Sequence, residues 1–158
     1  MRVIDILKNN GRALFTTTPS ARLSDCVITM ADNDAGSLLV IENGKLVGLL
    51  SFREVINILA KRQKEERQGP TPAVADLLVG QVMKPDPIVI DPELKLVELR
   101  GLMVQTRQRY MPVLDHGVVL GVVSFYDVAK AVHETQEFEN RMLKSYIGDW
   151  PVLETEES

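Results

Sequence analysis

The sequence predicts a mixed α/β (α+β) protein of two β-α-β-β-α units related by a pseudo-twofold axis, with a short N-terminal helix and a long C-terminal helix. Two observations support this prediction. The octet GLLSFREV at residues 48–55 returns 73 residues later as GVVSFYDV at residues 121–128, and residues 15–56 align with residues 88–129 without a gap. Each copy also alternates short β-branched runs with apolar residues at helical spacing.

Each copy is expected to open with a strand and a helix. A short apolar run, at residues 14–17 and again at residues 88–90, predicts the strand. A proline follows, and we expect it to occupy the first turn of a helix that the preceding residue caps. These prolines are Pro19 and Pro92, and the expected caps are Thr18 and Asp91.

The second part of each copy predicts a hairpin followed by another helix. Asn43-Gly44 lies between two apolar runs, and this dipeptide is typical of a two-residue hairpin turn. His116-Gly117 is the weaker counterpart in the second copy. The helices after the hairpins are expected to begin near Ser51 and Ser124.

The segments outside the repeats complete the expected division of the chain. We expect an N-terminal helix at 1–12, a first repeat at 13–65, a linker with a short helix at 66–82, a second repeat at 83–135, and a C-terminal helix extension with a tail at 136–158. The apolar pattern of the last helix continues to about Ile147, which is longer than the fold of one repeat needs. Its far end is therefore expected to pack on something else.

Composition excludes several classes of protein. The 158 residues carry a net charge of −4, which disfavours nucleic acids and anionic membranes as partners. No apolar run approaches the roughly 20 residues of a membrane span, and the N-terminus does not resemble a signal peptide. The only cysteine, Cys26, cannot form an intrachain disulfide, so a cytoplasmic location is expected. His116 and His133 have no metal-ligand neighbours in the sequence, so no metal is expected.

The two octets allow two interpretations. Ser51-x-x-Glu54 and Ser124-x-x-Asp127 fit a capping box, in which the serine caps the helix and the acid accepts from the backbone N–H of the serine. The same turn can also bind a ligand, because a helix N-terminus presents free N–H groups and a carboxylate can accept hydrogen bonds from a diol. Local sequence supports both interpretations equally.

The repeats resemble a pair of CBS domains, also called a Bateman module. QVMKPDPIVIDPE is similar to the entry of a second CBS domain, and RQRYMPVLDHGVVLGVVSFYDVAKAV is similar to its second half. The resemblance covers about residues 3 to 135. It implies two repeats packed through their sheets, and the flanking helices make the chain similar to stand-alone bacterial two-CBS proteins.

The resemblance implies a non-enzymatic sensor of an adenosine ligand, such as AMP, ADP, ATP, NAD(H) or S-adenosylmethionine, bound between the repeats. No cofactor would be required. Asp127 would bind the ribose, Ser124 would lie near the ribose or phosphate, and Val122 and Tyr126 would line the pocket. The other residues that the resemblance implies are Thr18, Ala35, Gly36 and Ser37 at the base, and Arg109 and Arg107 at the phosphate.

The pseudo-symmetry implies a second cleft that departs from the family pattern. It would be formed by Ser51, Arg53, Glu54, Val89 and Ile90. Glu is one methylene longer than the usual Asp, and the acid at position 91 replaces the threonine of the first copy and would repel a phosphate. This cleft is expected to be weaker, empty or altered in specificity.

Three alternatives remain open on the sequence. The chain could be an S-adenosylmethionine sensor or a structural dimerisation module with degenerate sites. It could also hydrolyse a nucleotide, although the sequence offers no nucleophile–base pair and no metal cluster. The apolar C-terminal helix suggests a homodimer, and the protein that the sensor would regulate is not identified by the sequence.

Overall fold

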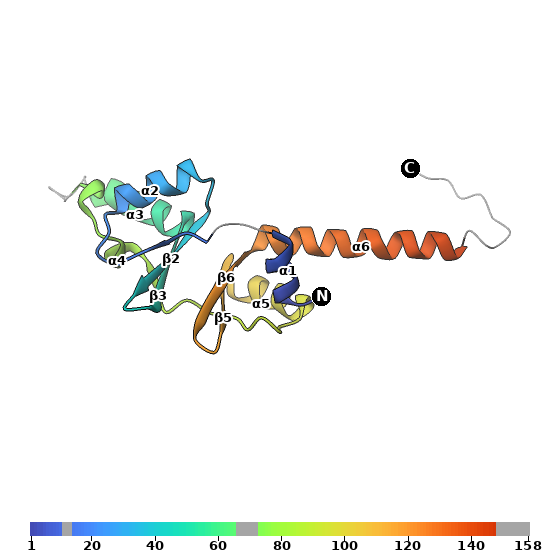
Figure 1. Cartoon of the computed structure of the whole chain (residues 1–158). Helices are drawn as coiled ribbons and strands as arrows, with labels where there is room; N and C mark the ends of the chain where they lie inside the picture. Colours follow the sequence, from blue (N-terminus) through green and yellow to red (C-terminus); the bar gives the residue numbers. More distant parts are fainter. Residues whose placement is uncertain (11–13, 66–72, 148–158) are drawn as a thin grey trace.

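The computed structural model describes residues 1–10, 14–65 and 73–147, and it has the predicted α/β fold with helices at both ends (Figure 1). The first half contains α1 (Val3–Asn10), β1 (Thr16–Thr17), α2 (Leu23–Asp32), β2 (Ser37–Glu42), β3 (Lys45–Ser51) and α3 (Phe52–Glu65). The second half contains the 3-10 helix η1 (Val74–Asp76), α4 (Val79–Val82), β4 (Lys84–Pro85), α5 (Leu96–Thr106), β5 (Tyr110–Asp115), β6 (Val118–Ser124) and α6 (Phe125–Ile147).

The strands form one four-stranded sheet and one hairpin. The larger sheet has the order β1-β2-β3-β4, in which β1 is parallel to β2 and the other pairs are antiparallel. β5 and β6 form an antiparallel pair. The register shifts between Val40 and Ile41 in β2, and again between Val113 and Leu114 in β5. The irregularity therefore repeats at the same 73-residue offset as the sequence.

The strand predicted at residues 88–90 is wrong in extent, because only Ile90 forms a bridge, to Val113. The cause is the side chain of Gln108, which is buried. Its Oε1 accepts a hydrogen bond from the Ile88 N–H at 3.1 Å, and its Nε2 donates to the Ile88 carbonyl at 2.8 Å. A side-chain amide therefore satisfies the backbone groups that would otherwise pair with a strand.

The helices expected at the two prolines begin four residues later than predicted. Pro19 and Pro92 lie in turns that are closed by Ala21 N–H to Thr18 O (3.2 Å) and by its counterpart, Leu94 N–H to Asp91 O (3.1 Å). Proline suits the second position of such a turn, because its φ is already fixed there. The predicted caps are therefore wrong, and the helices begin at Leu23 and Leu96 with no side-chain cap.

Both predicted hairpin turns are confirmed. Asn43 and Gly44 have φ values of 53° and 75°, and His116 and Gly117 have values of 50° and 82°. Positive φ at both central positions matches the twist of the flanking strands, which is why Asn-Gly predicted the first turn so directly.

The short helix that enters each repeat packs on the other repeat. The η1–α4 segment bonds to the first repeat, and α1 bonds to the second. The first set of backbone bonds is Leu23 N–H to Leu77 O (2.8 Å), Val79 N–H to Ala21 O (2.9 Å) and Gly80 N–H to Pro19 O (2.9 Å). The second set is Leu96 N–H to Met1 O, Val3 N–H to Leu94 O and Ile4 N–H to Pro92 O, all 2.9 Å. The two sets of bonds join equivalent positions. The exchange of entry helices between the two repeats therefore follows the pseudo-twofold symmetry.

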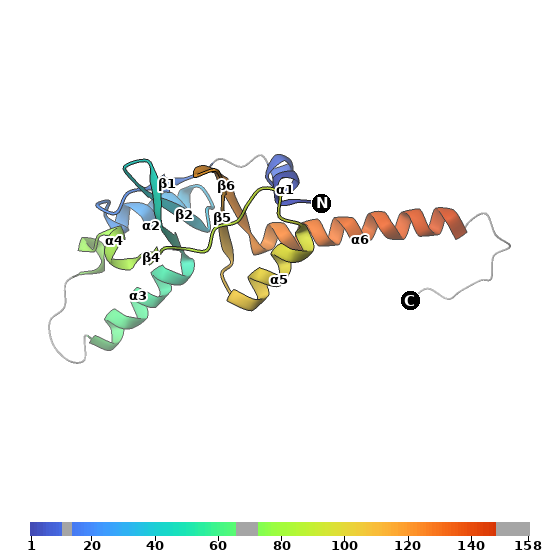
Figure 2. The same cartoon turned by 90° about the horizontal axis from the view of Figure 1, so that it is seen from below.

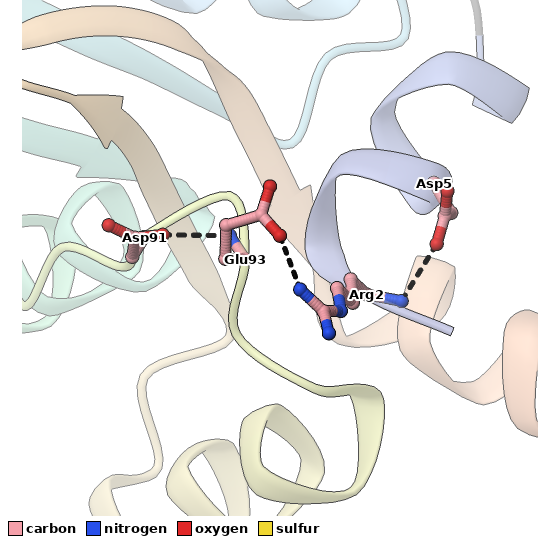
Figure 3. Close-up of polar contacts among 4 residues, drawn as sticks. All are labelled: Arg2, Asp5, Asp91 and Glu93. Carbon is pink, nitrogen blue, oxygen red and sulfur yellow. Dashed lines mark hydrogen bonds and ion pairs between the residues drawn. The ribbon is translucent and has the colours of Figure 1, made fainter.

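Side chains support the docking of α1 at its first turn (Figure 3). The Arg2 guanidinium donates to the Glu93 carboxylate at 2.5 Å, and the Arg2 backbone N–H donates to Asp5 at 2.9 Å. Asp91 accepts from the Glu93 N–H at 2.8 Å and so holds the turn that presents Glu93. Both ion-pair side chains are more than half exposed, so this pair adds little stability compared with burial of α1.

Each half has its own apolar core, and the exchange divides each core between distant parts of the chain. The first core contains Leu23, Cys26, Met30, Leu38, Val40, Leu50, Leu77 and Val79. The second contains Val3, Ile6, Ile90, Leu96, Leu99, Met103, Met111, Val113, Val123, Val128 and Ala131. The entry helices are therefore structural parts of the repeats on which they pack.

α6 extends past the second core, as its long apolar pattern predicted (Figures 1 and 2). Its first two turns bury Val128 and Ala131 against that core. Every residue from 136 to 147 is exposed, and this stretch spans about 18 Å at 1.5 Å per residue. Residues 66–72 and 148–158, predicted as part of the linker and as the tail, lie outside the described residues.

Replacing Ile6 by alanine tests the exchanged packing. Ile6 is 3% exposed within the second core, so Ile6→Ala should lower the free energy of unfolding by about 2–5 kcal/mol in urea titrations. Ile28→Ala is the control, because Ile28 is 58% exposed on α2 and its loss should cost less than about 0.5 kcal/mol. Equal effects would contradict the packing of α1 described here.

Candidate functional site

A cavity of about 450 Å³ lies between the two repeats. Its volume is within the range of about 300–1,000 Å³ that is usual for small-molecule sites. Its walls are Leu7, Asn10, Leu14, Phe15, Asn33, Asp34, Ala35, Gly36, Ser37, Tyr110, Leu120, Gly121, Val122, Ser124 and Asp127. One part of the wall is apolar, and the other contains hydroxyl, amide and carboxylate groups.

The cavity brings together six of the residues implied by the resemblance. Val122, Ser124 and Asp127 come from β6 and the first turn of α6. Ala35, Gly36 and Ser37 come from the other repeat, at the entry to β2. These two groups are about 90 residues apart in the sequence, and the packing of the repeats places them on one cavity.

Ser124 and Asp127 form the predicted capping box at the start of α6. The Ser124 backbone N–H donates to Asp127 Oδ2 at 2.9 Å, and the Asp127 N–H donates to Ser124 Oγ at 3.1 Å. The residues are only 8% and 4% exposed. The cap therefore fixes the Asp127 carboxylate at the cavity wall, so the two interpretations of this octet are compatible.

Four of the predicted residues do not line the cavity. Thr18 is exposed and its Oγ1 contacts Ser20 Oγ at 3.3 Å, while Tyr126 is 65% exposed. Arg107 is the exposed C-cap of α5, with a φ of 61°. Arg109 is also exposed, but its carbonyl accepts from the Phe125 N–H at 2.8 Å, which attaches it to the turn before Asp127.

The first octet forms a similar cap with different geometry. Glu54 Oε1 accepts from both the Ser51 N–H, at 2.7 Å, and the Ser51 hydroxyl, at 2.6 Å. The Arg53 N–H donates to Ser51 Oγ at 3.3 Å. The extra methylene of Glu54 thus lets one carboxylate oxygen bind both polar groups of the serine.

The two remaining residues of the predicted second cleft, Val89 and Ile90, differ in how far they are exposed to solvent. Ile90 is 5% exposed and belongs to the second core, whereas Val89 is 45% exposed. The side chain of Ile90 is therefore part of the apolar packing of its own repeat.

Sequence reasoning missed nine residues of the cavity wall. They are Leu7, Asn10, Leu14, Phe15, Asn33, Asp34, Tyr110, Leu120 and Gly121. Leu7 and Asn10 were missed because the exchange of α1 was not expected. A signal existed at Gly121, which repeats Gly48: a Cβ at Gly121 would lie 3.0 Å from Leu7, and one at Gly48 would lie 2.4 Å from Met83. Gly121 thus lets α1 approach β6 closely, and Gly48 lets Met83, which directly follows α4, approach β3 closely.

Other kinds of site receive no support from the parts of the chain that the structure covers. Among residues 1–10, 14–65 and 73–147, no three His, Cys, Asp or Glu side chains are grouped so that they could hold a metal ion. Within the same ranges, none of the helices is both long and apolar enough to cross a membrane.

The fold and the cavity define a pseudo-symmetric α/β protein with a cleft between its two repeats. Comparison with known families identifies these repeats: the CBS domain matches residues 4–61 and 79–134, which together make up more than half of the chain. The chain therefore belongs to the CBS-domain family and contains two CBS repeats. CBS domains are generally regulatory modules.

Known proteins agree with this assignment. The mitochondrial CBS domain-containing protein CBSX3 of Arabidopsis thaliana is 29% identical over 154 residues, which cover 92% of this chain and 71% of that protein. The solved structure of the CBS-domain containing protein ATU1752 from Agrobacterium tumefaciens has a TM-score of 0.73 and 23% identity, covering 83% of this chain and 98% of the other. The structure of CBSX2 in complex with AMP has a TM-score of 0.67 and 24% identity, covering 85% and 98%.

Removing the serine hydroxyl tests the cap at the cavity. Ser124→Ala should lower the free energy of unfolding by about 0.5–2 kcal/mol, because it removes the acceptor of an α6 N-terminal N–H. Ser145→Ala makes the same change at an exposed position near the other end of α6, where no such N–H needs an acceptor. Chemical denaturation should separate the two variants, and equal stabilities would argue against the capping role.

Proposed function

We propose that this protein is a regulatory CBS pair that binds an adenosine nucleotide, namely AMP, ADP, ATP or NAD(H), in the cavity between its repeats. Binding would signal through a change in conformation or in the surface offered to a partner. The chain would act as a sensor without catalysis or a required cofactor, and we place it in the cytoplasm.

One observation carries this proposal. A buried, rigidly capped carboxylate from the second repeat shares a cavity with a small-residue segment from the first. Asp127 can accept hydrogen bonds from neighbouring ribose hydroxyls, because a carboxylate has about four acceptor positions. Ala35 and Ser37, on either side of Gly36, have small side chains, so a planar base can approach this segment closely.

The remaining wall suits a nucleoside. Leu7, Leu14, Phe15 and Leu120 offer apolar contact to a base or to the carbon face of a ribose. The start of α6 adds the positive end of the helix dipole near Ser124. Such an arrangement favours a ligand with one apolar ring system and one polar end.

The phosphate would extend out of the cavity. We propose that Arg109 binds it, with Arg107 assisting, because both guanidinium groups are exposed and Arg109 is bonded through its carbonyl to the turn that precedes Asp127. Arginine can bind phosphate with two parallel charge-assisted hydrogen bonds. Their exposure leaves both side chains able to reorient toward a ligand.

We propose that the second cleft binds adenosine ligands more weakly or not at all. The Glu54 carboxylate accepts two hydrogen bonds from Ser51, one of them from its hydroxyl, so both polar groups of this octet are engaged with each other. A ribose would have to compete with these bonds. The corresponding serine hydroxyl oxygen at position 124 accepts a hydrogen bond from the Asp127 backbone N–H instead.

One structural neighbour supports this ligand class. CBSX2 has been solved in complex with AMP, and its overall fold is similar to that of this chain. The AMP moiety is common to the proposed ligands, so AMP is the first candidate. S-adenosylmethionine remains the alternative adenosine ligand, and a structural module with degenerate sites is the alternative in which none binds.

We also propose that the protein is a homodimer in which α6 contributes to the interface. Phe138, Met142 and Leu143 are each more than half exposed. They continue the face of α6 that Val128 and Ala131 bury against the second core. A helical segment of this length is marginal in water without packing, so an apolar face of a second copy would stabilise it.

Two matched variants test the ligand site. Asp127→Ala and Glu54→Ala each remove the acid of one capping box. Only Asp127→Ala removes the carboxylate that is proposed to bind the ribose. In isothermal titration with AMP, ATP, NADH and S-adenosylmethionine, Asp127→Ala should abolish most of the binding and Glu54→Ala should change it much less. Equal losses would overturn the assignment of the site.

Titration and thermal-shift measurements with the same four compounds distinguish the alternatives for the intact protein. A ligand at about 100 times its Kd should stabilise the fold by roughly 2.7 kcal/mol, which a thermal shift would detect. No shift and no heat with any of the four compounds would favour the structural module. Preference for S-adenosylmethionine over the nucleotides would replace the proposed ligand class.

Polar substitutions on α6 test the dimer. The double variant Phe138→Ser and Met142→Ser should convert the dimer to a monomer in sedimentation experiments, because it removes apolar area from the proposed interface. The control is Asn140→Ser with Lys144→Ser, which changes two positions on the polar side of the same helical segment. A monomeric native protein, or dissociation of both variants, would contradict the proposal.

A further inference from the structure

Tyr110 connects the two repeats at the cavity wall. It is the first residue of β5 in the second repeat, and its register partner on β6 is Ser124. Its side chain reaches the first repeat at Gly36: a Cβ built on that glycine would lie 1.9 Å from the Tyr110 hydroxyl oxygen and 2.6 Å from Cζ. The ring therefore occupies the space that any side chain at position 36 would need.

Tyr110 occurs on one side of the pseudo-symmetry only. Its counterpart 73 residues earlier is Ser37, whose register partner is Ser51. The counterpart of Gly36 is Arg109, and both carbonyls accept from the amide that starts the following helix, at 3.3 Å from Phe52 and 2.8 Å from Phe125. The fold thus offers two equivalent places for this contact, and the sequence puts an aromatic ring against a glycine in just one of them.

We infer that Tyr110 is a specificity-determining residue that limits the size of the base the cavity accepts. The inference rests on the proposed function, in which the segment that includes Gly36 contacts the nucleotide base. The ring and this segment both line the cavity, so the ring closes the wall beside the base. On this inference the cavity accepts an unsubstituted adenine between this ring and the apolar wall, and it excludes a base with a bulky substituent.

On this inference, both Tyr110 and Gly36 are needed to keep the cavity wall closed beside the base. A larger residue at position 36 would displace the ring, and a smaller residue at position 110 would leave the wall open beside the base. Protein interiors are closely packed, so a gap of this size is not closed by small shifts of neighbouring atoms. The cavity should therefore widen when the ring is removed.

Base size is tested by comparing AMP with two bulky analogues, N6-benzyl-AMP and 8-benzylamino-AMP. The native protein should bind AMP at least 100-fold more tightly than either analogue in isothermal titration. Tyr110→Ala should reduce this ratio at least tenfold for one or both analogues, whereas Tyr110→Phe, which keeps the ring, should preserve it. Tyr146→Ala, an exposed change near the end of α6, is the control and should leave the ratio unchanged.

The outcomes separate this inference from the proposed function. If the native protein binds AMP and Tyr110→Ala leaves both ratios unchanged, the inference is wrong and the proposed function stands. If the native protein binds AMP and discriminates less than tenfold against both analogues, the inference is also wrong. If the native protein does not bind AMP at all, both fail.

A double-mutant cycle tests the contact without any ligand. Gly36→Ala should lower the urea midpoint of the native protein, because the three atoms nearest to the new Cβ all belong to Tyr110. In the Tyr110→Ala background the same substitution should have little effect. Equal shifts in the two backgrounds would show that the ring does not occupy this space, and would overturn the inference even if Tyr110→Ala bound no nucleotide.

Discussion

The exchange of the entry helices is the constraint on which the rest of the structure depends. Each repeat buries an apolar helix that precedes the other repeat in the sequence, so neither core is complete without a distant segment. The exchange also brings the last turns of α1 to the wall of the cavity, through Leu7 and Asn10. The same packing that stabilises the second core therefore forms part of the site. A ligand in this cavity would contact elements from both repeats and from α1, which gives it a physical route to alter how they pack.

The octets show how one local motif can both cap a helix and supply a cavity wall. A capping box holds a carboxylate in a fixed position at the start of a helix, where the positive end of the helix dipole also favours polar ligands. In the second repeat the carboxylate that makes this cap also lines a cavity. In the first repeat a longer side chain bonds to the serine hydroxyl as well. A difference of one methylene thus changes which hydrogen bonds remain within the cap.

The two halves keep their symmetry in the backbone and lose it in their side chains. The β-bulges, hairpin turns, proline turns and entry contacts all recur at equivalent positions. The differences are at the cleft, where Tyr110 corresponds to Ser37 and Arg109 to Gly36. Backbone hydrogen bonding and core packing restrict the bulges, turns and entry contacts, because a change in any of them would leave a buried polar group without a partner or would leave a void. Residues at the cleft are less restricted by folding, so the two halves can diverge there.

The sequence by itself determined the local features and the repeat. The 73-residue offset, the Asn-Gly turn and the capping boxes could be predicted, because each depends on φ preferences or on hydrogen bonds between residues close in the chain. The pairing of Asp127 with the Gly36 segment could be predicted only through resemblance to a family. The tertiary structure decided the rest: the exchange of α1, the replacement of a strand by the Gln108 side chain, and the contact of Tyr110 with Gly36. These features join residues 20 to 95 positions apart, and their energies come from burial and hydrogen bonds that exist only once both repeats are packed.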